Sequence, residues 1–531
     1  MRSTLGKFVF VTGGVVSGLG KGVVTASLGG ILRSCGVLVT LQKADPYINV
    51  DAGTMNPYEH GEVFVTSDGQ ETDLDIGHYE RFTQQELTAA NYLTTGQVYW
   101  NVIQAERRGD YLGHTVQVVP HVTDEIKRLI RRTQEVTGAE VTIVEVGGTV
   151  GDIEGLPYLE ALRQLRDELP REDTAFVHLT YVPVLSTTGE LKTKPTQHSV
   201  RELRASGIQP DIIVARTPTP LTAGLREKIA LFCDVSVSHV VQERDVESIY
   251  EVPLILREEG MDEKLLRRLR IASRPGDLSP WEEFVRRLKQ PNGSVRIGIV
   301  GKYVEAQDAY MSIVESLRHA GAAVGTAVEL VWIYSTAVEG DESVLDGLDG
   351  ILVPGGFGER GIEGKVRAAD YARRGQVPFF GICLGMQCAV IAFSRSVLGW
   401  RDAVSTEFSP QGEYPVIDLL PEQRSVENKG DTMRLGQYPA VLQEGSRAWA
   451  AYSQGEIVER HRHRYEFNPE YMEQFRRAGM ELTGVSPDGR FVEVVELADH
   501  PWYVGVQFHP EFTSRPLQPH PLFKEFVRAC M

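Results

Sequence analysis

The sequence has no apolar run approaching the roughly 20 residues that cross a bilayer. Its N-terminus also lacks the basic segment, apolar stretch and cleavage site of a secretory signal. We therefore expect a cytoplasmic protein with no membrane partner. Hydrophobic residues make up 42% of the chain and charged residues 24%, which is typical of an ordinary globular protein.

Cysteine is scarce, and basic residues are outnumbered. The five cysteines form no CxxC pair, so the sequence predicts neither a disulfide framework nor a zinc site. The 55 Lys and Arg residues against 72 Asp and Glu give a formal net charge of −17. Such a surface repels nucleic acid, so we expect no nucleic-acid partner. A phosphate ligand would need a focused basic pocket.

The chain of 531 residues is too long for a single hydrophobic core. In both halves, β-branched runs alternate with amphipathic stretches, which predicts βαβ units and two doubly wound α/β domains. We predict domains at 1–272 and 295–531, joined by a linker at 273–294 that contains turn residues and a short helix near 281–289. A polar segment at 422–431 interrupts the second domain. The predicted strands are 8–12, 37–42, 141–146, 176–181 and 211–215 in the first half, and 295–300, 328–333, 350–353, 378–382 and 503–508 in the second.

A candidate nucleophile follows a strand of the second half. Phe379–Met386 reads as a strand, then G-x-C-x-G centred on Cys383, then a helix, which is the thiol counterpart of a nucleophile elbow. A helix start favours the thiolate. A cysteine between glycines is, taken alone, more often a buried structural thiol. However, His509 and Glu511 follow another apolar strand, and they supply a base for the thiol and a carboxylate to orient the imidazole.

A third element supports this interpretation. Leu352–Gly358 is a glycine-rich turn after a strand, where backbone N–H groups can approach a developing oxyanion. We expect the N–H groups of Gly356 and Leu384 to serve there. The three elements, in this order, resemble class I glutamine amidotransferases from about residue 295 onward. The resemblance implies that Cys383 attacks the side-chain amide of glutamine and releases ammonia.

The first half opens with a phosphate-type loop. After the strand 8–12, Gly13–Gly22 forms a glycine-rich turn before a helix expected near Val23, with Lys21 placed to reach phosphates. The strict G-x-x-x-x-G-K-[ST] pattern fails twice, because Val15 replaces its first glycine and Gly22 its hydroxyl residue. A glycine-rich turn alone could equally be a tight bend. Carboxylates for Mg²⁺ are available in Glu71–Asp75 and at Glu145, although either could be a solvated acid.

Four segments together resemble the CTP synthase family over nearly the whole chain: Thr12–Gly22, Lys43–Asp51, Glu145–Glu154 and Lys192–Gln197. The resemblance implies an N-terminal dethiobiotin-synthetase-like, P-loop-like amidoligase domain and a C-terminal class I glutamine amidotransferase domain. It implies that ATP phosphorylates O4 of UTP and that ammonia from L-glutamine then gives CTP. It further implies Mg²⁺ with ATP, GTP as allosteric activator, CTP as inhibitor, and a homotetramer.

The same resemblance assigns residues to sites. Catalysis falls to Cys383, His509, Glu511 and Lys21, and Mg²⁺ to Asp75 and Glu145. ATP is assigned Gly18, Leu19, Gly20, Lys21, Gly22, Val23, Asp75, Arg244, Asp245 and Val246. UTP and CTP are assigned Ser17, Asp152, Ile153, Glu154, Lys192, Thr193, Lys194, Pro195, Thr196, Gln197 and Lys228. Glutamine is assigned Gly356, Leu384, Gly385, Met386, Gln387, Glu407 and Arg464. His60–Val63 resembles the segment near the ammonia passage, and Arg360 is a candidate for GTP.

Two departures from the family pattern and two rival functions stay open. Residue 244 is Arg where some relatives have Lys, and 424–431 differs from the expected form, so the adenine contacts and the nearby lid are less secure. Lys192, Lys194 and Lys228 could be solvated lysines. One rival is an amidoligase that acts on a carboxylate, such as a corrinoid side-chain amidase. Another is a catalytically silent assembly scaffold, which would require loss of the nucleophile, base or Lys21.

Overall fold

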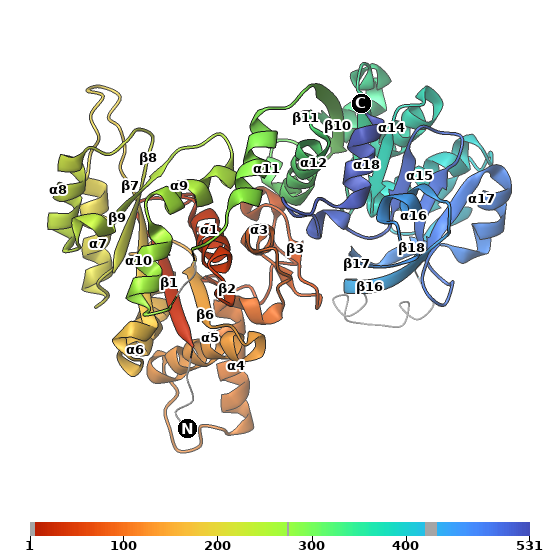
Figure 1. Cartoon of the computed structure of the whole chain (residues 1–531). Helices are drawn as coiled ribbons and strands as arrows, with labels where there is room; N and C mark the ends of the chain where they lie inside the picture. The colour runs from red at the N-terminus through yellow and green to blue at the C-terminus, as the bar shows by residue number, and fades with distance from the viewer. Residues whose placement is uncertain (1–5, 273–274, 420–432) are drawn as a thin grey trace. The chain divides into compact units, whose positions relative to one another are not determined.

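A computed structural model describes residues 6–272, 275–419 and 433–531 (Figure 1). The chain forms two compact units, the first made of 1–54 and 75–285 and the second of 55–74 and 286–531. The polar segment at 422–431 lies outside the described residues. Across the described ranges, no helix is long and apolar enough to cross a bilayer.

The first unit contains a seven-stranded sheet in the order β5-β2-β6-β1-β7-β8-β9. Every neighbouring pair is parallel. Parallel strands need crossover helices and are buried on both faces, which accounts for the apolar runs in the sequence. The strands are β1 (Lys7–Gly13), β2 (Val39–Asp45), β5 (Tyr92–Thr94), β6 (Val141–Val146), β7 (Thr174–Tyr181), β8 (Ile212–Thr217) and β9 (Val240–Arg244).

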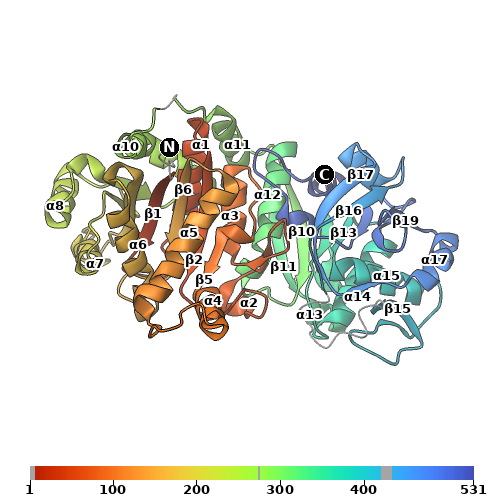
Figure 2. The ribbon, with the colours of Figure 1, turned by 90° about the horizontal axis from the view of Figure 1, so that it is seen from below.

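Helices cover both faces of this sheet (Figure 2). One face packs against α1 (Lys21–Ser34), with α9 (Val252–Glu258) beside it. The other packs against α5 (Thr123–Thr137) and α6 (Leu156–Glu168), and continues along α7 (Lys194–Ala205) and α8 (Ala223–Cys233). Phe8 and Phe10 point to the face of α5 and α6 and are fully buried there. The predicted doubly wound α/β fold is confirmed for this unit.

The second unit has a nine-stranded sheet in the order β11-β10-β12-β13-β21-β20-β19-β16-β17. The first five strands are parallel, and the remaining strands are added in antiparallel fashion. The sequence did not predict this antiparallel extension. The strands are β10 (Ser294–Gly301), β11 (Ala327–Tyr334), β12 (Gly350–Val353), β13 (Phe379–Ile382), β16 (Arg434–Leu442), β17 (Glu456–His463), β19 (Met480–Val485), β20 (Val492–Leu497) and β21 (Tyr503–Val506).

Two helical layers enclose the parallel part of this sheet. On one side lie α12 (Met311–Val324) and α18 (Pro521–Ala529), and on the other lie α14 (Ile362–Gly375) and α15 (Leu384–Ser396). The neighbouring residues Phe379 and Phe380 point to opposite layers, as the alternation of a strand requires. Each strand predicted from the sequence is present, and the short predicted helix is α11 (Ser279–Lys289).

Residues 55–74 leave the first unit and fold onto the second. They form α2 (Pro57–His60) and a small hairpin of β3 (Phe64–Val65) with β4 (Glu71–Thr72). Buried Glu62 accepts a hydrogen bond from the backbone N–H of Ser312 at 2.8 Å. Arg462 pairs with Glu71 at 2.7 Å. A segment from the N-terminal half is thus built into the C-terminal unit.

Candidate functional site

The carboxyl ends of three neighbouring strands converge in the second unit. The order β12-β13-β21 places the turn after Val353, Cys383 and the segment before His509 side by side. Registers pair Val353 with Gly381, and Ile382 with Val506. Open parallel sheets bind ligands at this edge.

Cys383 occupies a strained turn between β13 and α15. Its backbone has φ 52° and ψ −107°, a conformation that L residues rarely adopt. The flanking glycines are required by space: an added carbon at Gly381 would lie 2.8 Å from the Gly385 backbone, and one at Gly385 would lie 2.0 Å from the Val353 carbonyl oxygen. Such a sharp turn presents the thiol at the edge of the sheet.

His509 and Glu511 form a buried pair beside this thiol. His509 Nδ1 lies 2.7 Å from Glu511 Oε1. Burial alone lowers the pKa of His509, but the charges of Glu511 and Cys383 outweigh burial and raise the pKa to about 10. His509 Nε2 has no hydrogen-bond partner among the described residues. The imidazole is therefore held in its cationic form with one nitrogen available to a substrate.

The glycine turn lies against both groups. A carbon added to Gly355 would come within 2.9 Å of His509 Cε1 and 3.5 Å of Cys383 Cβ. Further along, the Gly358 N–H donates to Glu407 Oε1 at 3.1 Å. Burial raises the pKa of Glu407, against the opposing charges of Lys302 and Arg464. The predicted glutamine residues Gly356, Leu384 and Glu407 thus lie around one site.

Gln387 supports the same region from α15. Its Nε2 donates to the Tyr465 carbonyl at 3.0 Å and to Gln507 Oε1 at 3.1 Å. Gln507 Nε2 in turn donates to Cys383 Sγ at 3.7 Å. Gln507 was not predicted from the sequence, although it lies two positions before His509. Gly385 and Met386 line the start of α15, where both are buried.

The second cluster lies at the carboxyl edge of the first unit, where β2, β6 and β1 are neighbours. Glu145 pairs in register with Val11 and with Lys43. Lys43 Nζ lies 3.0 Å from Glu145 Oε1 and 3.7 Å from Asp45 Oδ1, and it also pairs with Asp75. Burial raises the pKa of Glu145 despite this lysine. Three carboxylates therefore converge on one cation.

The glycine-rich turn lies beside this cluster. Its geometry accounts for both departures from the strict G-x-x-x-x-G-K-[ST] motif. Val15 has φ +87°, the region that favours glycine, so the position keeps a glycine-like backbone without the glycine. A carbon added to Gly22 would lie 1.9 Å from Asp75 Oδ1, so the carboxylate fills the space of the missing side chain. Helix α1 begins at Lys21, two residues before the predicted start. Lys21 Nζ donates to the Gly148 carbonyl at 2.7 Å.

The predicted nucleotide segments lie on loops and helix starts of the same unit. Asp152 Oδ2 accepts from the Thr149 N–H at 2.8 Å, while Ile153 is 79% exposed. Lys192 pairs with Glu190 at 2.5 Å, and Lys194 lies 5.8 Å from the centre of the Phe232 ring. Thr193 directly precedes α7, Pro195–Gln197 belong to the first turn of this helix, and Lys228 lies on α8. Helix α7 contacts α8, but no hydrogen bond or ion pair among the described residues joins Asp152 to Lys228.

The predicted adenine segment meets the phosphate turn through one arginine. Arg216 Nε pairs with Asp245 at 2.9 Å, and its Nη1 donates to the Leu19 carbonyl at 2.9 Å. Arg244 lies 3.6 Å from Glu258. Sequence reasoning missed Arg216, although its place at the end of the strand β8 was a usable signal.

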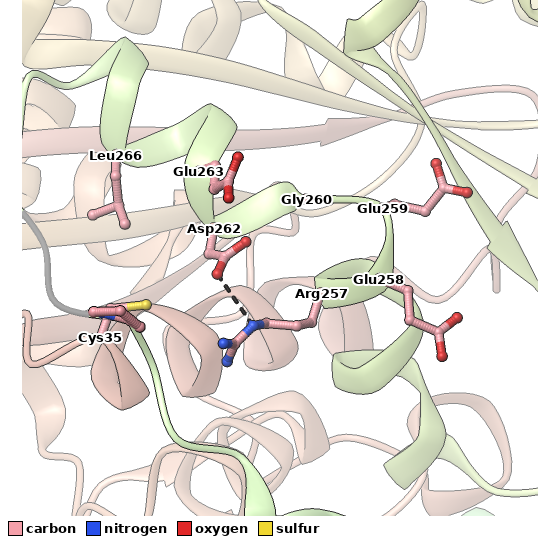
Figure 3. A pocket seen from close by; sticks show the side chains of 9 residues that line it. Cys35, Arg257, Glu258, Glu259, Gly260, Asp262, Glu263 and Leu266 are labelled. Atoms are coloured by element: carbon pink, nitrogen blue, oxygen red, sulfur yellow. Dashed lines mark ion pairs between the residues drawn. The ribbon is translucent and has the colours of Figure 1, made fainter.

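A separate surface pocket of about 530 Å³ lies beside α9 and α10 (Met261–Arg268) (Figure 3). Arg257 pairs with Asp262 across it at 3.2 Å. Acidic side chains and Cys35 provide most of the remaining polar lining. None of the predicted site residues lines this pocket.

The two edges define a class of protein. A doubly wound unit with a phosphate-type turn beside three carboxylates, joined to an α/β unit with a buried Cys-His-Glu set, is the organisation of a glutamine-dependent ligase. The family described as CTP synthase N-terminus matches residues 7–271, and glutamine amidotransferase class-I matches residues 305–529.

Full-length relatives agree. A CTP synthase from Carboxydothermus hydrogenoformans is 59% identical over 99% of this chain and 98% of its own length. One from Caldanaerobacter subterraneus is 57% identical with the same coverage. The solved glutaminase domain of Trypanosoma brucei CTPS with bound acivicin is 39% identical, over 44% of this chain and 93% of that one, with a TM-score of 0.43. The chain belongs to the CTP synthase family, whose reaction is the glutamine-dependent amination of UTP to CTP.

Proposed function

We propose that the second unit hydrolyses L-glutamine at Cys383 and that the first unit uses the ammonia, with ATP, to aminate UTP at C4. The proposal for glutamine hydrolysis rests on one observation: Gly355 lies close to both His509 and Cys383 at one edge of the sheet. Family membership carries the choice of UTP as acceptor.

Glutamine hydrolysis follows from the residues at that edge. The Cys383 thiolate adds to the side-chain amide carbon, and the carbonyl electrons move onto oxygen, which faces the N–H groups of Gly356 and Leu384. The His509 imidazolium gives its proton to the amide nitrogen, the C–N bond breaks and ammonia leaves. Water then adds to the γ-glutamyl thioester while His509 accepts its proton, and the C–S bond breaks to release glutamate.

Binding of the glutamine zwitterion is assigned to opposite charges. Glu407 would hold the ammonium group and Arg464 the carboxylate. The proximity of the Arg464 charge to Glu407 supports this pairing. Leu384–Gln387 and Gly356 would contact the side-chain amide.

In the first unit, Gly18–Val23 would hold the ATP phosphates, with Arg244–Val246 toward the adenine. Lys21 would balance the charge of the transferred phosphoryl group as O4 of UTP attacks it. Ammonia would then add at C4, and phosphate would leave. Arg216 supports the arrangement because it joins Leu19 to Asp245.

The carboxylates fit Mg²⁺. Asp75 and Glu145 offer hard oxygen donors, and Mg²⁺ usually takes one or two carboxylates together with substrate phosphates and water. The placement of Asp75 where the strict motif has its hydroxyl residue supports this assignment. When bound, Mg²⁺ would neutralise the charge of the ATP phosphates.

Pyrimidine binding and regulation are finer proposals. Ser17, Asp152–Glu154, Lys192–Gln197 and Lys228 would bind UTP, and CTP as inhibitor at the same groups. GTP would activate glutamine hydrolysis near Arg360. We further propose a homotetramer in which a second subunit completes these sites, since the exposed side chain of Ile153 is accessible to a partner subunit.

The test is ultraviolet absorbance of the purified protein with UTP, ATP, Mg²⁺ and glutamine, with and without GTP. Conversion of the 4-oxo to the 4-amino pyrimidine is expected, and GTP should accelerate it. Failure with both glutamine and ammonia, while glutamine is still hydrolysed, would instead favour a carboxylate acceptor.

A further inference from the structure

A buried lysine lies behind the glycine turn of the second unit. Lys365 is in the first turn of α14 and is only 1% exposed. Its Nζ donates to the Pro354 carbonyl at 2.9 Å and to the Gly355 carbonyl at 3.5 Å. Within the described ranges, no carboxylate forms an ion pair with Lys365.

Burying such a cation is unfavourable. Lysine is almost never fully buried unless it is paired, because an ammonium loses its hydration. Burial lowers the pKa of Lys365 to about 8, against the opposite influence of Cys388 and Cys383. An apolar side chain would pack at this position without that cost. A functional role of Lys365 must therefore lie in its contacts, which are with the backbone of the glycine turn.

The geometry of the peptide group specifies that role. In a trans peptide, the C=O of one residue and the N–H of the next point in opposite directions. With the Gly355 carbonyl turned toward Lys365, the Gly356 N–H is turned away from it. A Gly-Gly peptide has no Cβ to resist rotation, and Gly356 has φ +152°. A polar anchor is what keeps such a peptide in one orientation.

We propose that Lys365 is a positioning residue for glutamine hydrolysis, which holds the Pro354 and Gly355 carbonyls so that the Gly356 N–H faces the oxyanion. The inference rests on the proposed function of Cys383. Gly355 itself adjoins Cys383 and His509, so a rotation of this peptide would place a carbonyl oxygen beside the reacting carbon. A carbon added to Gly356 would lie 3.8 Å from Lys365 Nζ, so the cation also adds positive potential behind the oxyanion.

Lys302 differs from Lys365 in position and contact. It donates to the Phe357 carbonyl at the far end of the turn and is only partly buried. Its loss would leave the Gly355–Gly356 peptide anchored. Lys365 alone, among the side chains described here, donates to the two carbonyls that precede Gly356.

The test compares Lys365→Met with the wild type in the full chain. Methionine matches the apolar stem of lysine but removes the donor and the charge. We expect kcat for glutamine hydrolysis to fall by about 100-fold, as for loss of one oxyanion donor, while KM for glutamine changes by less than about threefold. Ammonia-dependent CTP formation should be unchanged. Arg367→Met is the matched control, because Arg367 lies on the same helix, is exposed and donates to the Glu339 carbonyl.

Unchanged kcat in Lys365→Met, or a parallel loss of ammonia-dependent activity, would overturn the proposal. If Lys365→Met does not fold, Lys365→Gln removes the charge and places its N–H donor on a side chain one atom shorter, which holds the two carbonyls less well. That variant should lose about tenfold in kcat with KM unchanged, and wild-type kcat in it would overturn the proposal equally. Absence of glutamine hydrolysis in the wild type would instead overturn the proposed function of Cys383.

Discussion

Phe64 and Phe512 pack edge to face, with ring centroids 5.0 Å apart. Phe512 in turn stacks on the His509 imidazole, at 5.1 Å and an interplanar angle of 14°. Phe64 belongs to the segment 55–74, which departs from the first unit and folds onto the second. A residue of the N-terminal half therefore supports the ring of the candidate base.

Replacing Phe64 should weaken glutamine hydrolysis selectively. An aromatic pair contributes about 0.5–1.5 kcal/mol beyond its buried area, and Phe64→Leu removes it while keeping an apolar side chain. We expect kcat/KM for glutamine to fall by up to about tenfold, with ammonia-dependent synthesis little changed. Phe475→Leu is the control, since Phe475 packs on Phe393 and Phe467 in the same unit. Equal losses in both variants would indicate general destabilisation.

Cys383→Ala separates the two reactions. Without the thiol no thioester forms, so glutamine-driven CTP formation should fall to background. Ammonia supplied in solution should still support synthesis at the wild-type rate, because the proposed ATP and UTP groups lie in the first unit. Measuring CTP with each nitrogen donor checks this, and loss of both activities would contradict a two-site enzyme.

Lys21→Ala should have the complementary effect. Without the ammonium group of Lys21 at the phosphate turn, the rate of CTP formation should fall by at least about 100-fold, whether glutamine or ammonia is the nitrogen donor. Glutamine hydrolysis, followed as glutamate release, should persist. Lys7→Ala is the control, because Lys7 pairs with Asp173 at the start of β1, at the opposite end of this strand from the turn. Ammonia-dependent synthesis in Lys21→Ala would refute the phosphate-binding role.

The sequence predicted the parallel cores because buried parallel strands are continuous apolar runs, as in 350–353 and 379–382. Cys383, His509 and the glycine turn were predicted together because strand ends meet at one edge of such a sheet. Several strands were missed: β5 has only three residues, β17 carries charged side chains along its length, and β16 contains Gly436 and Pro439.

Contacts between distant segments escaped prediction for a different reason. Nothing in the composition of 55–74 distinguishes a segment that packs on the second unit from a loop of the first. Lys365 looks like a solvated helical lysine, and only the structure places its Nζ on the Pro354 carbonyl. Likewise, only the structure shows that Lys43 forms ion pairs with Asp45, Asp75 and Glu145.

Restoring the hydroxyl of the strict phosphate-loop motif should impair the enzyme. In Gly22→Ser, the new Cβ would come within 1.9 Å of Asp75 Oδ1, so the carboxylate must move. We expect ammonia-dependent CTP formation to fall by at least about tenfold and the apparent affinity for Mg²⁺-ATP to weaken. Gly224→Ala is the control, because an added carbon there meets no atom within 4 Å. A fully active Gly22→Ser variant would show that the hydroxyl can replace Asp75.

Glu511→Gln should shift the pH dependence of glutamine hydrolysis. Burial alone lowers the pKa of His509, and the charges of Glu511 and Cys383 raise it to about 10. Without the Glu511 charge the pKa of His509 must fall, so the imidazolium that protonates the departing nitrogen is lost at lower pH. The alkaline limb of the kcat/KM profile should therefore move to lower pH by at least about one unit, while the profile for ammonia-dependent synthesis stays in place. Glu525→Gln is a suitable control, since Glu525 pairs only with Arg528 on α18 among the described residues. An alkaline limb that does not move in Glu511→Gln would mean that the carboxylate orients the ring without setting its charge.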